Sequence, residues 1–164
     1  DHDDLEGLTA EDFLHIYEVN VVGPYQMVRA VVPSMKKIGR ASIINISSLA
    51  GLRGSGSSIA YATSKGALIT MTLSLARALG PEIRVNAICP GFIQGDWLRQ
   101  GLGPEKYEIS KRNIEKMTPL RMTAAPEMVA ETIIYFIISA PLITGETLIL
   151  DGGAHLTIAS AVRR

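Results

Sequence analysis

Apolar residues recur along the chain at two spacings, and stretches of the two kinds alternate. Three short runs rich in β-branched residues predict buried strands, at 42–47, 83–89 and 146–150. Three longer stretches repeat apolar residues every three or four positions and predict helices, over 10–37, 58–79 and 126–139. Gly23-Pro24 is expected to bend or break the first helix, because proline lacks an N–H and clashes with the preceding turn.

Strands that alternate with helices of this length predict parallel β-α-β units with right-handed crossovers. We therefore expect an α/β fold, with about three strands in a single domain that spans 1–164. The segment 92–125 is too long for an ordinary connection. Loops of this unusual length are typically lids or binding loops. The chain lacks an initiating methionine, which favours a start partway into a longer protein.

Composition narrows the class of protein further. Hydrophobic residues make up 47% of the chain and aromatic residues 5%, which suits an aliphatic α/β core. Sixteen basic residues balance sixteen acidic ones, so nothing favours nucleic acid or an anionic membrane as a partner. The longest apolar run, 133–138, is too short to span a bilayer.

The single cysteine, Cys89, excludes an intrachain disulfide and a cysteine metal cluster. It precedes Pro90 at the end of a predicted strand, where a small buried side chain is expected rather than a reactive thiol. Three histidines are scattered along the chain, so no metal site is expected. The single cysteine fits a protein of the reducing cytoplasm.

Gly51, Gly54 and Gly56 follow the first predicted strand and raise the question of a phosphate site. A dinucleotide-binding turn requires Gly-x-Gly-x-x-Gly and an acidic residue at the end of the next strand. The spacing here is reversed, and that strand ends Ile88-Cys89-Pro90 without a carboxylate. A Walker motif is absent as well. We therefore expect a flexible turn rather than a phosphate site.

The polar residues around these glycines are more informative. Ser48 stands at the C-terminal end of a predicted strand, where ligands collect in open α/β sheets. Tyr61 and Lys65 are four positions apart at the start of a predicted helix, so their side chains share one face. An ammonium near a phenol stabilises the phenolate, which suits Tyr61 to general acid–base catalysis, and the Ser48 hydroxyl could bind a carbonyl oxygen. This chemistry suits the interconversion of an alcohol and a ketone, with the hydride supplied by a cofactor.

With these residues in this order, the chain resembles the classical short-chain dehydrogenase/reductase (SDR) family, and within it the 3-oxoacyl-acyl-carrier-protein reductases. The matching segments are Glu18-Val19-Asn20-Val21, Ile43-Ile44-Asn45-Ile46-Ser47-Ser48, Tyr61-Ala62-Thr63-Ser64-Lys65, Ile83–Gly91, Thr144-Gly145 and Asp151-Gly152-Gly153. The resemblance implies the C-terminal two-thirds of a Rossmann-like, doubly wound parallel sheet. The family's N-terminal cofactor-binding half, with its Gly-x-x-x-Gly-x-Gly turn, has no counterpart in the sequence.

The resemblance also implies catalytic roles. Tyr61 would donate or accept the proton, Lys65 would assist it and bind the nicotinamide ribose, and Ser48 would orient the substrate carbonyl. Asn20 would support a water in a proton relay. Since the N-terminal half is missing, we expect this chain by itself to bind the cofactor very weakly or not at all.

Further roles concern the cofactor and the substrate. The backbone around Pro90, Gly91 and Ile93 would face the nicotinamide of NAD(H) or NADP(H), although the family's threonine in this loop is replaced by Gly95. The segment 92–125 would be the substrate loop. Candidate pocket residues in it are Trp97, Leu98, Leu102 and Tyr107.

The function expected from the resemblance is that of an NAD(P)(H)-dependent oxidoreductase acting on a small secondary alcohol or ketone. It would be a cytoplasmic homodimer or homotetramer, with the helices at 10–37 and 58–79 as packing faces. Two alternatives stay open. One is a 3-oxoacyl-acyl-carrier-protein reductase, in which Lys36, Lys37 and Arg40 could dock the carrier protein. The other is a non-catalytic fragment that acts through contacts with full-length family members.

Overall fold

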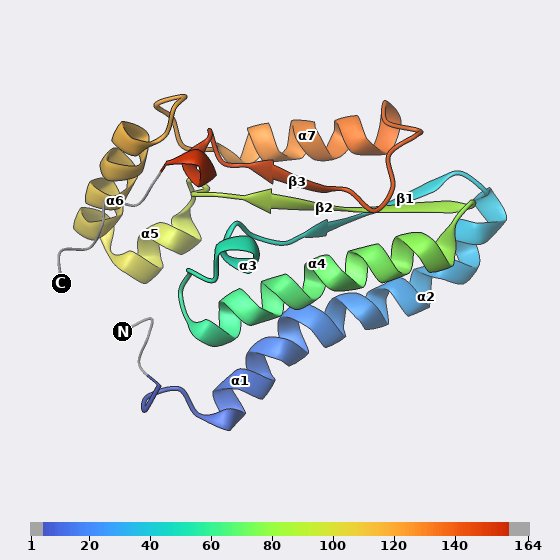
Figure 1. Cartoon of the computed structure of the whole chain (residues 1–164), viewed down its shortest axis with the longest axis horizontal. Coiled ribbons are helices and arrows are strands. Elements are labelled where there is room, and N and C mark those ends of the chain that lie inside the picture. Colours follow the sequence, from blue (N-terminus) through green and yellow to red (C-terminus); the bar gives the residue numbers. More distant parts are fainter. Residues whose placement is uncertain (1–4, 158–164) are drawn as a thin grey trace.

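The computed structural model describes residues 5–157 as a three-stranded parallel sheet with helices on both faces (Figure 1). The strands β1, β2 and β3 have the bounds Ala41–Ile46, Ile83–Pro90 and Thr147–Leu150. Helices α2 and α4 cover one face and α7 covers the other, with bounds Gly23–Ile38, Ile59–Leu79 and Pro126–Ile138. The predicted α/β fold with three parallel strands is confirmed.

The central strand of the sheet is β2. It pairs with β1 from Ala41↔Ile83 to Ile46↔Ile88, and with β3 from Ala87↔Thr147 to Pro90↔Leu150. Helices on both faces and strands on both sides cover β2, and every residue of this strand except Arg84 is buried. Within residues 5–157, β1 has a strand on one side only.

The hydrophobic core lies between the sheet and the layer formed by α2 and α4. Its buried members come from all three elements that meet there, namely Val28, Ala76, Leu79, Ile83 and Val85. This packing fixes α4 against β2, and so fixes where the residues at the start of α4 lie relative to the end of the sheet.

The first predicted helix is interrupted close to the expected place. Helix α1 (Ala10–Tyr17) leads into a π-helical turn, η1 (Glu18–Val22), and α2 begins at Gly23. Pro24 lies in the first turn of α2, where its missing N–H costs little. The interruption therefore falls just before Gly23-Pro24, as a π-helical turn, a feature that is frequent at functional sites.

The segment 92–125 is not an extended loop. It contains two helices at the carboxyl end of the strands, α5 (Asp96–Leu102) and α6 (Pro104–Met117), which we call the lid (Figure 1). Pro104 suits the first turn of α6, and Lys111 and Glu115 form an i,i+4 ion pair at 3.9 Å.

The shorter elements are α3 (Ala50–Arg53) and η2 (Ala154–Leu156). No helix in the described part of the chain is long and apolar enough to cross a membrane.

Candidate active site

The four predicted catalytic residues lie on elements that meet at the carboxyl end of the sheet (Figure 1). Asn20 is in η1, Ser48 follows β1, and Tyr61 and Lys65 lie in the first two turns of α4. The Ser58 hydroxyl caps α4 by accepting a hydrogen bond from the backbone N–H of Tyr61 at 3.1 Å. This cap fixes where α4 begins, and the spacing of four residues puts Tyr61 and Lys65 on one face of the helix.

Two hydrogen bonds connect Asn20 to the first turn of α4. Asn20 Nδ2 donates to Ser64 Oγ at 3.0 Å, and Ser64 Oγ donates to the backbone carbonyl of Tyr61 at 2.7 Å. Ser64 is fully buried. The sequence analysis did not identify Ser64 as a site residue, although its position three after Tyr61 places it one turn further along the same helix. Because the Asn20 amide nitrogen is engaged, Oδ1 is the atom that could accept a hydrogen bond from a water.

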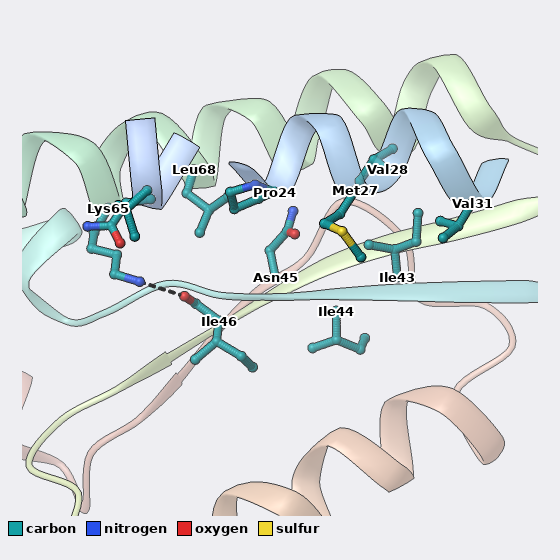
Figure 2. A pocket seen from close by; sticks show the side chains of 12 residues that line it. Pro24, Met27, Val28, Val31, Ile43, Ile44, Asn45, Ile46, Lys65 and Leu68 are labelled. Carbon is teal, nitrogen blue, oxygen red and sulfur yellow. Dashed lines mark hydrogen bonds between the residues drawn. The ribbon is translucent and has the colours of Figure 1, made fainter. Parts of the chain in front are cut away.

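Lys65 lies beside both Tyr61 and the edge of the sheet. Its Nζ is 5.7 Å from the centre of the Tyr61 ring, and it donates a hydrogen bond to the backbone carbonyl of Ile46 at 2.9 Å (Figure 2). Burial lowers the pKa of the Lys65 ammonium from its ordinary value. The structure therefore brings the charged group close to Tyr61, but its hydrogen bond goes to the end of β1.

Gly56 lies between the turn that follows Ser48 and the ring of Tyr61. The Ser48 hydroxyl accepts a hydrogen bond from the N–H of Ala50 at 3.1 Å, which leaves its own proton free to be donated. A Cβ on Gly56 would lie 2.9 Å from Cβ of Ala50 and 3.1 Å from Cδ1 of Tyr61. The absence of a side chain at Gly56 thus allows the turn after Ser48 to pack on the Tyr61 ring.

The glycines after β1 do more than provide a flexible turn, which is all that the sequence led us to expect. A Cβ on Gly51 would lie 2.6 Å from the carbonyl carbon of Lys65, so α3 and α4 touch backbone to backbone at this point. Gly54 ends α3 in the left-handed region, with φ +68°. The segment contains a short helix held against α4.

A second serine holds the backbone of Lys65. Ser47 Oγ donates to the carbonyl of Lys65 at 2.8 Å. Ser47 is another residue that the sequence analysis did not place in the site, although it precedes Ser48 directly.

Cys89 is completely buried, as expected for a small apolar side chain, and burial raises the pKa of its thiol.

The end of β2 is packed against the segment that follows β3. Gly91 donates its N–H to the carbonyl of Leu150 at 3.0 Å, and a Cβ on Gly91 would lie 2.8 Å from Cβ of Asp151. Ile93 forms a parallel bridge with Ala124. The backbone of Pro90, Gly91 and Ile93 is therefore held in place at the same end of the sheet as Ser48.

The predicted pocket residues of the lid occupy different environments. Trp97 is 83% exposed, Leu98 is half-buried and Leu102 is exposed. Tyr107 is only 6% exposed, and its ring lies 5.6 Å from that of Phe92. Tyr107 thus packs inside the lid, and its contact with a substrate stays a prediction.

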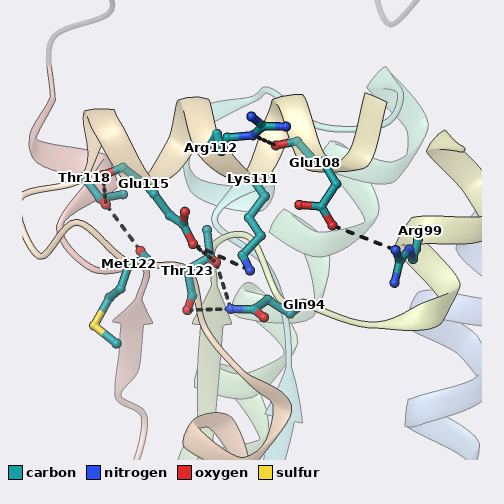
Figure 3. Close-up of polar contacts among 9 residues, drawn as sticks. All are labelled: Gln94, Arg99, Glu108, Lys111, Arg112, Glu115, Thr118, Met122 and Thr123. Carbon is teal, nitrogen blue, oxygen red and sulfur yellow. Dashed lines mark hydrogen bonds and ion pairs between the residues drawn. The ribbon is translucent and has the colours of Figure 1, made fainter. Parts of the chain in front are cut away.

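Polar contacts fasten the lid to the segment before α7 (Figure 3). Gln94 Nε2 donates to Thr123 Oγ1 at 3.0 Å, and Thr123 Oγ1 donates to Glu115 Oε1 at 3.2 Å. Lys111 completes the group through its ion pair with Glu115. Thr123 is buried, so this network links the start of the lid, α6 and the return segment in one place.

The segment after β3 closes the site on another side. Asp151 is buried and accepts hydrogen bonds from the N–H of Gly153 at 2.9 Å and of His155 at 2.7 Å. His155 Nδ1 also lies 3.0 Å from Asp151 Oδ1. Arg53 of α3 donates to the carbonyl of Ala154 at 3.2 Å, so the turns after β1 and β3 are joined.

These residues together offer a hydroxyl, a phenol, an ammonium and a carboxamide at one end of a parallel sheet. Such groups can bind a carbonyl oxygen, exchange a proton with it and bind sugar hydroxyls. Within residues 5–157 there is no group of three or more histidine, cysteine and acidic side chains that could hold a metal ion.

Comparison with known proteins identifies the family. A family model described as enoyl-(acyl carrier protein) reductase matches residues 1–155. The chain is 37% identical over 148 residues to the 3-oxoacyl-[acyl-carrier-protein] reductase of Rattus norvegicus, covering 90% of this chain and 58% of that protein. It is 40% identical over 134 residues to the short-chain dehydrogenase/reductase homolog YusR of Bacillus subtilis, covering 82% of this chain and 98% of that protein.

A solved structure agrees with this result. The structure of a 4-hydroxyisoleucine dehydrogenase mutant complexed with NADH and succinate superposes with a TM-score of 0.81 at 30% identity, covering 93% of this chain and 63% of that one. The chain spans about three-fifths of the length of several curated relatives that it matches. The chain belongs to the short-chain dehydrogenase/reductase family of oxidoreductases.

Proposed function

We propose that this chain forms the proton-transfer site of an NAD(P)(H)-dependent oxidoreductase that interconverts a secondary alcohol and a ketone. The observation that carries the proposal is the position of Lys65 Nζ, 5.7 Å from the centre of the Tyr61 ring. The two residues share one face of α4 next to the end of the strand that precedes Ser48. The reductase names of the relatives support the same reaction type.

In the direction of reduction, Tyr61 donates its hydroxyl proton to the carbonyl oxygen while a hydride adds to the carbonyl carbon. The Ser48 hydroxyl donates a hydrogen bond to the same oxygen and so stabilises the negative charge that develops there. The Lys65 ammonium stabilises the phenolate that Tyr61 becomes. A water bound by Asn20 Oδ1 then returns a proton to Tyr61.

A nicotinamide cofactor, when bound, supplies or removes the hydride. Lys65 and Tyr61 suit the ribose next to the nicotinamide, because an ammonium and a phenol can both hydrogen-bond to sugar hydroxyls. The backbone of Pro90, Gly91 and Ile93 would face the nicotinamide ring. The NADH-bound relative supports this cofactor class. The sequence offers no glycine-rich turn for the pyrophosphate, so the fit extends only to the nicotinamide half.

The lid is the proposed substrate-binding element. Trp97 and Leu98 lie near the start of α5, directly after the segment that would face the nicotinamide. The high exposure of Trp97 provides a large apolar surface for the organic part of a substrate. We propose that Trp97, Leu98 and Ser48 contact the substrate.

The second candidate function is reduction of a 3-oxoacyl chain on an acyl carrier protein. The rat relative of that name supports it. Lys36, Lys37 and Arg40 are exposed around the C-terminal end of α2, where they could contact an acidic carrier protein. Turnover of a 3-oxoacyl thioester well above that of small ketones would favour this candidate.

We also propose a cytoplasmic homodimer or homotetramer that packs through α1, α2 and α4. The exposed apolar side chains on these helices support this assembly, including Leu14 of α1 and Leu73 of α4. A fragment that only pairs with full-length family members would use the same helices. Capture of a full-length family member, without any turnover, would favour that alternative.

The proposed reaction is tested on the protein at the length that its gene encodes. Oxidation of NADH and of NADPH is followed with a small ketone and with a 3-oxoacyl thioester. We expect ketone-dependent oxidation with at least one of the two cofactors. A protein that binds the cofactor but oxidises it equally with and without any carbonyl substrate would not have this function.

A further inference from the structure

The hydroxyl of Ser64 takes part in two hydrogen bonds, although it has one hydrogen to donate. It donates to the backbone carbonyl of Tyr61 at 2.7 Å. Because that hydrogen is used, the Ser64 oxygen acts only as an acceptor toward Asn20. The carboxamide of Asn20 must therefore present its NH₂ group to Ser64, and Nδ2 donates to Ser64 Oγ at 3.0 Å.

The reverse orientation of the Asn20 carboxamide would cost a hydrogen bond. Oδ1 would then face the Ser64 oxygen, and the serine hydrogen would have to leave the Tyr61 carbonyl in order to bridge the two acceptors. Ser64 is 0% exposed, and at a buried position water does not replace the lost bond. Ser64 thus determines which end of the carboxamide faces away from α4.

The orientation of this carboxamide matters because a charged group lies near it. Asn20 and Lys65 border the same hollow beside the end of β1. The partial negative charge of Oδ1 is favourable near the Lys65 ammonium, whereas an NH₂ group in its place would set a second donor beside the cation. The arrangement with Nδ2 on Ser64 is therefore favoured from both ends of the carboxamide.

We propose that Ser64 is a positioning residue for proton transfer, which orients the Asn20 carboxamide so that Oδ1 alone is presented to the relay water. A water that donates one hydrogen to Oδ1 and accepts one from the Lys65 ammonium keeps its other hydrogen for the Tyr61 phenolate. The hydroxide that remains takes up a proton from solvent. With the carboxamide reversed, neither hydrogen of the water would be held, and transfer would wait for the water to reorient. This inference rests on the proposed function.

A second pair of residues on the same helix provides a matched control. Asn45 Nδ2 donates to Thr72 Oγ1 at 2.8 Å, and Thr72 Oγ1 donates to the backbone carbonyl of Leu68 at 2.8 Å. Thr72 is 0% exposed, as Ser64 is, and it lies about two turns further along α4. Thr72→Val therefore removes a buried hydroxyl with the same pattern of hydrogen bonds, but away from Tyr61.

The first measurement tests the orientation and needs no enzyme activity. The protein, at the length that its gene encodes, is labelled with ¹⁵N in asparagine, and hydrogen exchange of the side-chain NH₂ groups is followed by NMR. We expect the Asn20 group to exchange at least about tenfold more slowly than that of Asn113, which is exposed on α6. Ser64→Ala should remove most of this difference, and Thr72→Val should preserve it.

The second measurement tests the effect on proton transfer. Ser64→Ala should lower kcat for ketone reduction about tenfold or more with little change in KM. Its solvent isotope effect on kcat should rise above the wild-type value, because return of the proton becomes slower, and added imidazole should restore part of the rate. Thr72→Val should change neither the isotope effect nor the response to imidazole. Ser64→Thr keeps the hydroxyl and should resemble the wild-type protein in both.

Equal exchange of the Asn20 group in the wild-type protein and in Ser64→Ala would overturn the proposal. So would an unchanged isotope effect in Ser64→Ala, or the same increase in Thr72→Val. Should Ser64→Ala not fold, the wild-type exchange decides, and a rate equal to that of Asn113 would overturn the proposal. An active wild-type protein with an unaffected Ser64→Ala variant contradicts this inference alone, whereas a wild-type protein without ketone-dependent turnover contradicts the proposed function and the relay with it.

Discussion

The side-chain amide of Asn20 donates a hydrogen bond to the hydroxyl of Ser64 at 3.0 Å, across 44 positions of sequence. It joins the π-helical turn before α2 to the first turns of α4, between Tyr61 and Lys65. Since Ser64 also donates to the carbonyl of Tyr61, Asn20 helps to hold in place the helical turns that carry Tyr61 and Lys65.

Replacement of Ser64 by alanine should therefore destabilise the protein. It removes the partner of the Asn20 amide at a fully buried position, and an unsatisfied buried polar group costs about 1–3 kcal/mol. Urea denaturation of Ser64→Ala should show this loss. The matched control is Thr63→Ala, which removes a hydroxyl from the exposed neighbouring position. Equal stability of Ser64→Ala and Thr63→Ala would contradict the role given to Ser64.

Gly51→Ala should destabilise the contact between α3 and α4. The new methyl group would meet the carbonyl carbon of Lys65 at 2.6 Å, and backbone cannot move aside as a flexible side chain can. Overpacking of this kind costs about 1–3 kcal/mol. Gly101→Ala, in the lid helix α5 with nothing within 4 Å, should be neutral or slightly stabilising. Thermal denaturation of both variants tests the contact, and a stable Gly51→Ala protein would show that the glycine serves only flexibility.

Lys65 should make stability depend on pH in the alkaline range. Burial lowers its pKa below the ordinary value of 10.5, so between the lowered pKa and 10.5 the unfolded chain binds more protons than the folded chain. Stability contributed by this group therefore rises with pH across that window. Urea denaturation should show the wild-type protein gaining stability relative to Lys65→Met as pH is raised from neutral to 10.5. A difference that does not change with pH would mean that Lys65 is not desolvated.

Thr123→Val should loosen the lid. The substitution removes the hydroxyl that accepts from Gln94 and donates to Glu115. We expect faster hydrogen exchange in 93–95 and 122–124, and an increase in KM with a smaller change in kcat, because the lid is proposed to bind substrate. Thr132→Val on α7 removes a hydroxyl that bonds only within its own helix among the described contacts, and it serves as the control. Unchanged exchange in Thr123→Val would show that the network does not hold the lid.

The strands and the long helices could be predicted because each carries its own periodic pattern. The run at 42–47 became β1 at Ala41–Ile46, and the helical pattern at 58–79 became α4 at Ile59–Leu79. Tyr61, Lys65 and Ser48 were chosen as candidates from their spacing at the ends of predicted elements, and their roles stay predictions. These features are local in sequence, so they could be recognised without the fold.

The features that could not be predicted depend on contacts between distant segments. Ser64 matters because η1 lies against α4, and Gly51 matters because α3 touches α4 backbone to backbone. Tyr107 turned out to be an interior residue of the lid because Phe92 packs on it. The hydrogen bond of Lys65 to Ile46 depends on how α4 packs beside the end of β1, 19 positions away along the chain.

The most direct test of the proposed chemistry is the rate of ketone reduction by Tyr61→Phe, measured on the protein at the length that its gene encodes. Phenylalanine keeps the ring beside Gly56 and Lys65 but removes the proton donor, and general acid–base groups contribute roughly a hundredfold or more to a rate. Tyr25→Phe, at an exposed position of α2, is the control. We predict that Tyr61→Phe folds normally and loses at least about a hundredfold in kcat, while Tyr25→Phe keeps the wild-type rate. Equal rates for the wild-type protein and Tyr61→Phe would contradict the account.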